Sequence, residues 1–200
     1  MQSGIAKTSP RYLAGMITAS LVEICFGTIW GLAAASGRWI AFLPISIMAV
    51  GLLAFCITTR QAVRRLPQEQ ETPEDHVRGR QVSRRYVVVV AAEVLAIAVT
   101  VILLRLIKYP AGIAPAICLI VGLHFLPLAV VFQRRLYILI GAVLSLLGGG
   151  ALLAAPASLT PDSWPAIVGL GAAGVLWLAS LYNIMEVRRV LHLRPATGLA

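Results

Sequence analysis

The chain has 200 residues, of which 59% are apolar and only 12% are charged. A soluble globular domain usually carries about 25% charged residues, so this composition excludes an ordinary soluble domain and favours a membrane protein. The formal net charge of +9 does not indicate nucleic-acid binding, because no basic stripe with interleaved aromatic residues lies outside the apolar segments.

Six apolar segments follow one another along the chain, and each is long enough to cross a bilayer. A helix needs about 20 residues to span ~30 Å of hydrocarbon, and lipid offers the backbone no other hydrogen-bond partners. The sequence therefore predicts an all-α fold, a six-transmembrane-helix bundle that forms one domain. The predicted spans are residues 12–36, 39–59, 86–107, 111–132, 136–157 and 164–185.

The basic residues predict the orientation of these spans. Of the 17 Lys and Arg residues, only Arg38, Arg105 and Lys108 fall on one side of the six spans, and the rest fall on the side of the two termini. Lys and Arg concentrate in short cytoplasmic loops. We therefore expect a multi-pass protein of the bacterial cytoplasmic membrane with both termini in the cytoplasm.

The longest connection predicted between spans covers residues 61–84. Its centre, from Pro67 to Asp75, is acidic and contains two prolines, and arginines flank it on both sides. Such a stretch has too few apolar residues to pack, so we expect a mobile cytoplasmic loop. Two interpretations stay open: the loop is a docking site for a partner, or it is a solvated linker.

Pairs of spans share features that suggest three helical-hairpin repeats. Each pair opens with a basic and aromatic flank, and a proline precedes a glycine by the same spacing in the second and fourth spans, at Pro44 and Gly51 and at Pro115 and Gly122. Repeats of this kind occur in membrane transporters. The alternative is that any hairpin acquires such flanks from the charge rule alone.

Small residues recur every four positions in two spans, which places them on one helix face. Close helix approach in lipid depends on such residues, so we expect both faces to pack against other helices, with Glu23 pointing into the bundle. In the first span the ladder is Gly15, Ala19, Glu23, Gly27 and Gly31, and in the fifth it is Gly141, Ser145 and Gly149.

Three ionisable residues lie well inside the spans and form the main functional signal. Glu23, Glu93 and His124 fall roughly 12–18 Å along their helices from the nearest basic flank. Ionisable groups at such depth usually face a cavity, a partner or a proton path. We therefore expect a Glu–Glu–His site that binds protons or a small solute. The alternative is that each group only forms a hydrogen bond between helices.

The fourth span carries the string Gly-Leu-His-Phe-Leu-Pro-Leu at residues 122–128. Pro127 cannot donate to the carbonyl of Leu123, which predicts a kink and a freed carbonyl close to His124. The string resembles a motif of a family of uncharacterised bacterial multi-pass membrane proteins. The paired spans are also similar in architecture to the HdeD-type acid-resistance membrane proteins. These resemblances imply a bacterial membrane location and supply no catalytic residue.

Other chemistries have little support in the sequence. Cys25, Cys56 and Cys118 lie one per span without a CxxC pair, and no clustered metal ligands or phosphate-binding loop are visible. We therefore expect no metal site, no cofactor and no catalytic residue. An intramembrane enzyme acting on a lipid is the least supported class, because no nucleophile lies beside a base.

The sequence thus leaves two main functional hypotheses. The first is a proton-linked or small-solute permease or channel, or a stress-response membrane protein, that uses Glu23, Glu93 and His124. The second is a non-catalytic membrane subunit or scaffold that recruits a partner through loop 61–84. The expected partners are the lipid bilayer and either a second copy of the chain or a membrane complex, with no nucleic acid.

Overall fold

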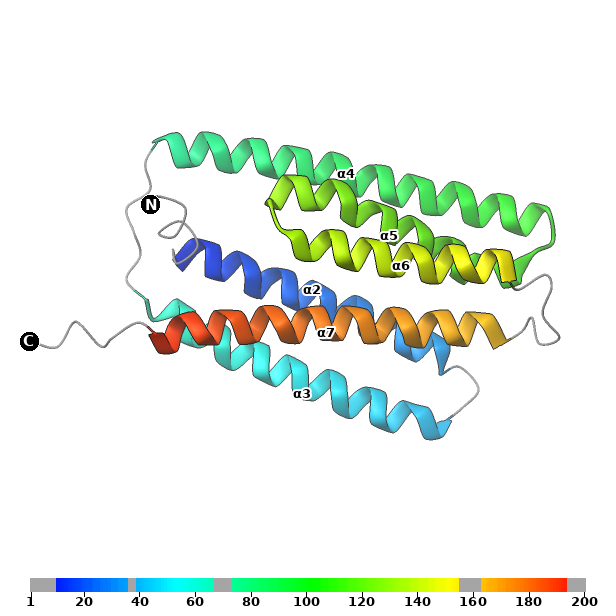
Figure 1. Cartoon of the computed structure of the whole chain (residues 1–200), viewed down its shortest axis with the longest axis horizontal. Coiled ribbons are helices and arrows are strands. Elements are labelled where there is room, and N and C mark those ends of the chain that lie inside the picture. Colours follow the sequence, from blue (N-terminus) through cyan, green and yellow to red (C-terminus); the bar gives the residue numbers. More distant parts are fainter. Residues whose placement is uncertain (1–9, 36–38, 67–72, 155–162, 194–200) are drawn as a thin grey trace, which may run out of the picture.

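The computed structural model describes residues 10–35, 39–66, 73–154 and 163–193, which form six long α-helices and one short 3₁₀ helix (Figure 1). No strand occurs among these residues, and the predicted all-α six-helix bundle is confirmed. The α-helices are α2 (Pro10–Ala34), α3 (Trp39–Arg64), α4 (Pro73–Leu106), α5 (Ile113–Phe132), α6 (Arg135–Ala154) and α7 (Trp164–Leu193); the 3₁₀ helix η1 (Pro110–Gly112) precedes α5.

All six α-helices are long and apolar enough to cross a membrane, so the chain is a multi-pass membrane protein. Consecutive helices run in opposite directions, and α2, α4 and α6 begin where α3, α5 and α7 finish (Figure 1). We call this the basic end of the bundle, because Arg64, Arg134 and Arg188 all lie near these helix ends. Helix α2 therefore begins at the same end at which α7 finishes (Figure 1).

The helices differ greatly in burial. Half of the most apolar stretch of α7 is buried, whereas no residue of the corresponding stretch of α4 is buried. Helix α4 packs mainly on α5 and lies along one side of the bundle (Figure 1). Most of the apolar surface of α4 is therefore left for lipid or for a partner.

The most extensive contacts do not follow the predicted hairpins. Helix α2 packs most extensively on α7, and α5 packs most extensively on α6, although α2 with α3 and α4 with α5 are also neighbours. Both main seams are lined by small residues, which let helix backbones approach closely. The bundle is thus held together by contacts between different hairpins.

The predicted limits of the loop 61–84 were wrong. Helix α3 continues to Arg64, and α4 already begins at Pro73. Gln, Glu and Arg favour helix, so these helices extend beyond their apolar stretches, which the hydropathy pattern alone misses. Helix α7 likewise continues from the predicted end at Met185 to Leu193. Residues 67–72, for which we expected mobility, lie outside the described residues.

Candidate functional site

Glu93 and His124 meet across the seam between α4 and α5. His124 Nδ1 lies 3.4 Å from Glu93 Oε2, and the two side chains are only 10% and 16% exposed. The contact lacks hydrogen-bond geometry, so His124 Nδ1 is a buried polar atom with no hydrogen-bond partner. The ring of His124 also interacts with the backbone of Val89. Two of the three residues predicted for the site are therefore neighbours.

The number of protons on this pair decides whether the contact is favourable. With one proton, the pair is either a neutral carboxyl donating to the ring or an ion pair, and both attract. Without this proton the carboxylate is ionised, and a neutral ring that carries its one hydrogen on Nε2 turns the lone pair of Nδ1 toward Oε2. With a second proton, an imidazolium ring lies beside a neutral carboxyl group, and the attraction between opposite charges is lost. The contact between Glu93 and His124 is thus sensitive to proton binding.

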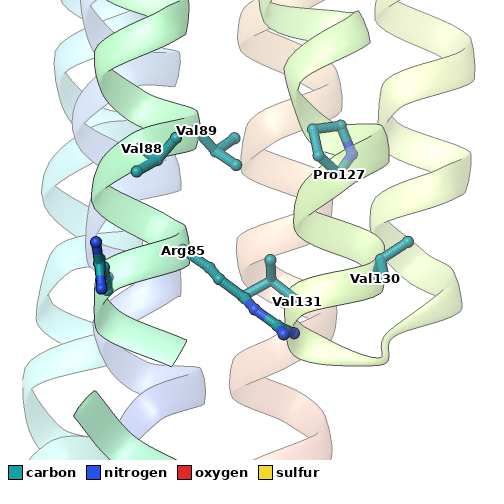
Figure 2. Close-up of a pocket in the computed structure, with 7 residues that line it drawn as sticks. Arg85, Val88, Val89, Pro127, Val130 and Val131 are labelled. Carbon is teal, nitrogen blue, oxygen red and sulfur yellow. The ribbon is translucent and has the colours of Figure 1, made fainter. Parts of the chain in front are cut away.

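An apolar groove lies next to this pair on the side of the basic end. It has a volume of 490 Å³ and lies between α4 and α5, with Val88 and Val89 on one wall and Pro127, Val130 and Val131 on the other (Figure 2). Arg84 and Arg85 complete the lining. Since Val89 precedes Glu93 by one helical turn and Pro127 follows His124 by nearly one turn, the groove leads toward the pair.

Pro127 lies inside α5, which continues as a helix through this residue. Its side chain is exposed and lines the groove. Because proline has no amide hydrogen, the Leu123 carbonyl lacks its usual helical donor. The kink predicted at Pro127 stays a prediction.

Glu23 belongs to a different polar cluster, on α2 and α7. Its side chain is 4% exposed, and Asn183 Nδ2 donates to both carboxylate oxygens, at 3.3 Å from Oε1 and 3.1 Å from Oε2. Among the described residues, no hydrogen bond or ion pair joins Glu23 to Glu93 or His124. The expected three-residue site is therefore not assembled, because similar depth in the membrane does not place residues on facing sides of their helices.

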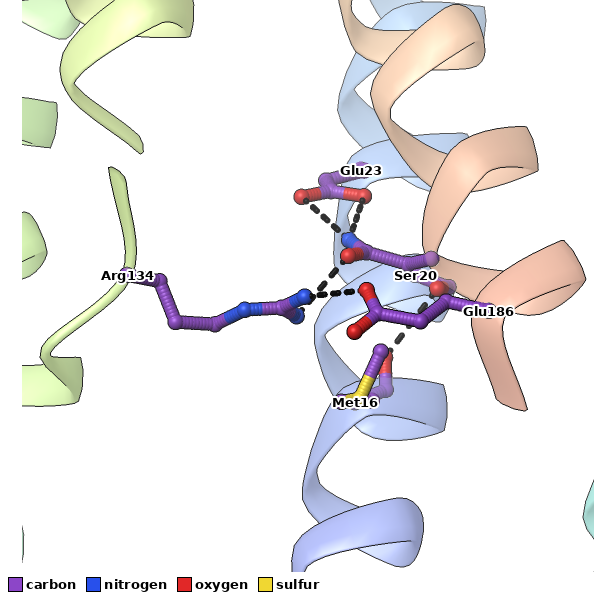
Figure 3. A network of polar contacts seen from close by, with 6 residues as sticks. Met16, Ser20, Glu23, Arg134 and Glu186 are labelled. Atoms are coloured by element: carbon purple, nitrogen blue, oxygen red, sulfur yellow. Dashed lines mark hydrogen bonds and ion pairs between the residues drawn. The ribbon is translucent and has the colours of Figure 1, made fainter. Parts of the chain in front are cut away.

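Arg134 extends the cluster around Glu23 toward the basic end. It reaches from the turn between α5 and α6, where Nη1 donates to Asn183 Oδ1 at 2.9 Å and Nη2 donates to Glu186 Oε2 at 2.6 Å (Figure 3). The preceding residue, Gln133, has a left-handed backbone with φ of 51°. This backbone ends α5 and starts the turn that carries Arg134. The chain Glu23–Asn183–Arg134–Glu186 ties α2, α7 and this turn together.

This cluster was hardly visible in the amino-acid pattern. Asn183 and Arg134 were not predicted as site residues, and Arg134 looked like one of several flanking arginines. The available signal was Asn183 itself, since a polar amide near the end of a span needs a hydrogen-bond partner in lipid.

The predicted small-residue face of α2 packs tightly at one end only. A methyl group added at Gly27 would lie 2.8 Å from the ring of Trp177, and one at Gly31 would lie 3.3 Å from Ile45. Ala19 is half-buried, but Gly15 is exposed with nothing within 4 Å of an added methyl group. The prediction for Gly15 was therefore wrong, because a four-residue step exceeds the helical period and gradually turns the ladder away from the contact face. On these turns of α2 the buried residues are Leu13, Met16 and Ile17.

The predicted small-residue face of α6 packs on α5, but Gly148 takes the place of Gly149 at the contact. An added methyl group at Gly141 would lie 2.7 Å from the carbonyl oxygen of Gly122, and one at Gly122 would lie 2.5 Å from the backbone nitrogen of Ser145. Gly149 has only an ordinary contact, whereas its neighbour Gly148 faces the α5 backbone directly. A four-residue step slightly exceeds the helical period, so the contact line moves from Gly149 to Gly148.

The described part of the chain contains no cluster of metal ligands, and its two buried cysteines have packing roles. No group of three or more His, Cys, Asp or Glu side chains there is placed to hold a metal ion. Buried Cys56 and Cys118 direct their thiols at the carbonyl oxygens of Ile17 and Leu144, at 3.7 and 3.4 Å. Both cysteines therefore act as small packing residues with weak donors.

Comparison of the chain with protein-family models, with curated proteins and with solved structures found no match in any of the three. The resemblances expected from residues 122–128 and from the paired spans therefore stay predictions. What the chain does has to be argued from its own geometry.

Proposed function

We propose that this protein is a proton-linked permease or channel of the bacterial cytoplasmic membrane, with Glu93 and His124 as its proton-binding element. The observation that carries the proposal is the 3.4 Å contact between these side chains across two helices. Two ionisable groups buried together in a membrane are costly and mark proton or solute paths. The place of Glu93 on the loosely packed helix α4 allows its contact with His124 on α5 to open.

The mechanism follows from the proton count of the pair. One bound proton holds α4 against α5, and gain or loss of a proton weakens this contact. Among the described residues, no third charged side chain lies within salt-bridge distance of either group. Arg84 and Arg85 are the nearest charges along α4 toward the basic end. Protons or a small solute would pass as α4 moves relative to the rest of the bundle.

Glu23 fits a structural role better than the proton role that the sequence first favoured. Both of its carboxylate oxygens accept from Asn183, which is itself held by Arg134. A group fixed in such a network stabilises the bundle and has less freedom to exchange protons with a path. We therefore assign proton binding to Glu93 and His124 and helix anchoring to Glu23.

The basic end is assigned to the cytoplasm. Positive charge near the ends of spans is retained on the cytoplasmic side, and the basic end holds most of the arginines. Protons would then reach Glu93 and His124 from the cytoplasmic side of the groove.

Flux measurements on purified protein in liposomes test the proposal. The vesicles enclose a pH-sensitive dye, and a potassium diffusion potential drives protons across the membrane. We expect the natural protein to let protons cross and so change the internal pH that the dye reports. Glu93→Gln should abolish this flux, because glutamine keeps the shape but does not ionise. His124→Gln should have the same effect.

Two matched variants serve as controls. Glu23→Gln should retain proton flux, and so should His192→Gln, which alters an exposed histidine at the end of α7. Full flux in Glu93→Gln, or no flux in the natural protein, would refute the proton-linked function.

A second candidate function, a membrane subunit or scaffold, is favoured by the outer face of α4. None of the most apolar stretch of this helix is buried, and Val94, Leu95 and Ile102 are each more than half exposed. A neighbouring protein could cover this face. Cross-linking through Leu95→Cys in native membranes, compared with Leu43→Cys on α3, would reveal a second copy or a partner that contacts α4 specifically.

A further inference from the structure

The groove between α4 and α5 has apolar walls and is lined by two arginines as well. Its walls are the valines of the two helices and Pro127, and Arg85 reaches from α4 toward Val131 of α5 (Figure 2). The volume of 490 Å³ falls in the range of about 300–1,000 Å³ that is usual for small-molecule sites. The groove is large enough to hold part of a ligand rather than a single water molecule.

The arginines of the groove have no acidic partner among the side chains that the structure describes. Arg84 and Arg85 are both exposed, and no acidic side chain among the described residues pairs with either. Both lie inside the span Gln81–Leu106 near its start. This position is at the level where lipid headgroups meet the hydrocarbon layer.

We infer that the groove binds an anionic phospholipid, with an acyl chain along the valine walls and the phosphate on Arg84 and Arg85. A free anion would leave the apolar walls uncovered, and an apolar helix of a partner would leave the two charges unpaired. Basic pockets between membrane helices on the cytoplasmic side characteristically hold anionic headgroups. This inference stands independently of the proton-linked function, because it uses neither Glu93 nor His124.

Native mass spectrometry of the detergent-solubilised full chain tests this site. The protein is titrated with phosphatidylglycerol and with phosphatidylcholine that carry identical acyl chains, and the dissociation constants are compared. We expect tighter binding of phosphatidylglycerol. In the double variant Arg84→Gln/Arg85→Gln its affinity should fall by about 30-fold, from the attraction of two arginines for an anionic headgroup.

A matched pair of arginines provides the control. Arg64→Gln/Arg65→Gln removes two exposed charges at the same end of the bundle but outside the groove, and should leave the affinity unchanged. Val131→Trp, which fills the groove, should weaken both lipids. All substituted arginines are exposed, so their variants should fold, and melting curves check this.

Four outcomes would overturn the inference. Equal affinity for the two lipids would remove the role of the arginines, and equal losses in the two double variants would reduce the effect to general surface charge. Displacement of the lipid by millimolar inorganic phosphate would indicate a free-anion site instead. Retained affinity in both Arg84→Gln/Arg85→Gln and Val131→Trp would place the lipid elsewhere.

Discussion

Nη2 of Arg134 lies 2.6 Å from Oε2 of Glu186, in an ion pair that joins the α5–α6 turn to α7. The next residue, Arg135, is exposed and begins α6. The positive-inside rule predicts a cytoplasmic position for both of these neighbouring arginines and does not distinguish their roles. In the folded protein only Arg134 turns inward, where it also supports the amide that holds Glu23.

Arg134→Gln should therefore destabilise the protein more than Arg135→Gln. Loss of the guanidinium leaves Oδ1 of Asn183 and the carboxylate of Glu186 without their donor, which should cost about 1–3 kcal/mol. An exposed substitution such as Arg135→Gln should change stability by no more than about 0.5 kcal/mol. Thermal melting in detergent measures both, and equal melting temperatures would contradict a structural role for Arg134.

Gly27→Leu should lower the melting temperature, whereas Gly15→Leu should not. Both changes add the same side chain to α2, but Gly27 faces Trp177 and Gly15 has open space around it. Overpacking at Gly27 should cost about 1–3 kcal/mol. If Gly15→Leu is the more harmful variant, the α2–α7 seam has been placed incorrectly.

Gly148→Ala should destabilise the α5–α6 seam, and Gly150→Ala should be harmless. The added methyl group at Gly148 meets the backbone of Pro115, Cys118 and Leu119, which has little freedom to move, and at Gly150 it meets nothing within 4 Å. We expect a cost of about 1–3 kcal/mol for Gly148→Ala. Melting curves of the two purified variants compare them directly, and a stable Gly148→Ala protein would show that the two helices lie further apart.

Reporter fusions should place the basic end in the cytoplasm. Fluorescent-protein fusions after Gln70 and Ala200 should be active, because fluorescence requires folding in the cytoplasm. Alkaline phosphatase fused at Lys108, between α4 and η1, should be active only if that end is outside. A dark fluorescent-protein fusion or an inactive phosphatase fusion would contradict the predicted orientation of the six spans.

The fold was predictable because span length and apolar content are properties of local sequence. A run of about 20 apolar residues predicts each membrane helix, whichever residues that helix contacts in the folded protein. The helix ends were less predictable, as the continuation of α3 to Arg64 and the start of α4 at Pro73 show. Hydropathy marks where lipid ends, not where the helix ends.

The candidate site was only partly predictable, because depth along a helix does not give direction around it. Similar depths correctly suggested that Glu93 and His124 could meet, but the same argument grouped them with Glu23. The partners of Glu23 depend on which sides of α2 and α7 face each other. Glu23 and Asn183, which meet there, are 160 positions apart in the sequence. Such pairing is set by the packing of the whole bundle.

This separation bears on how the protein is made. Translation at about 5–20 residues per second leaves roughly 8–32 s between the synthesis of Glu23 and that of Asn183. During this interval the first helix carries a carboxyl group whose native partner does not yet exist. Helix α2 is therefore held beside the insertion machinery or in the membrane without this partner, and only the arrival of α7 gives Glu23 its final surroundings. Synthesis of α7 thus also completes the packing of α2.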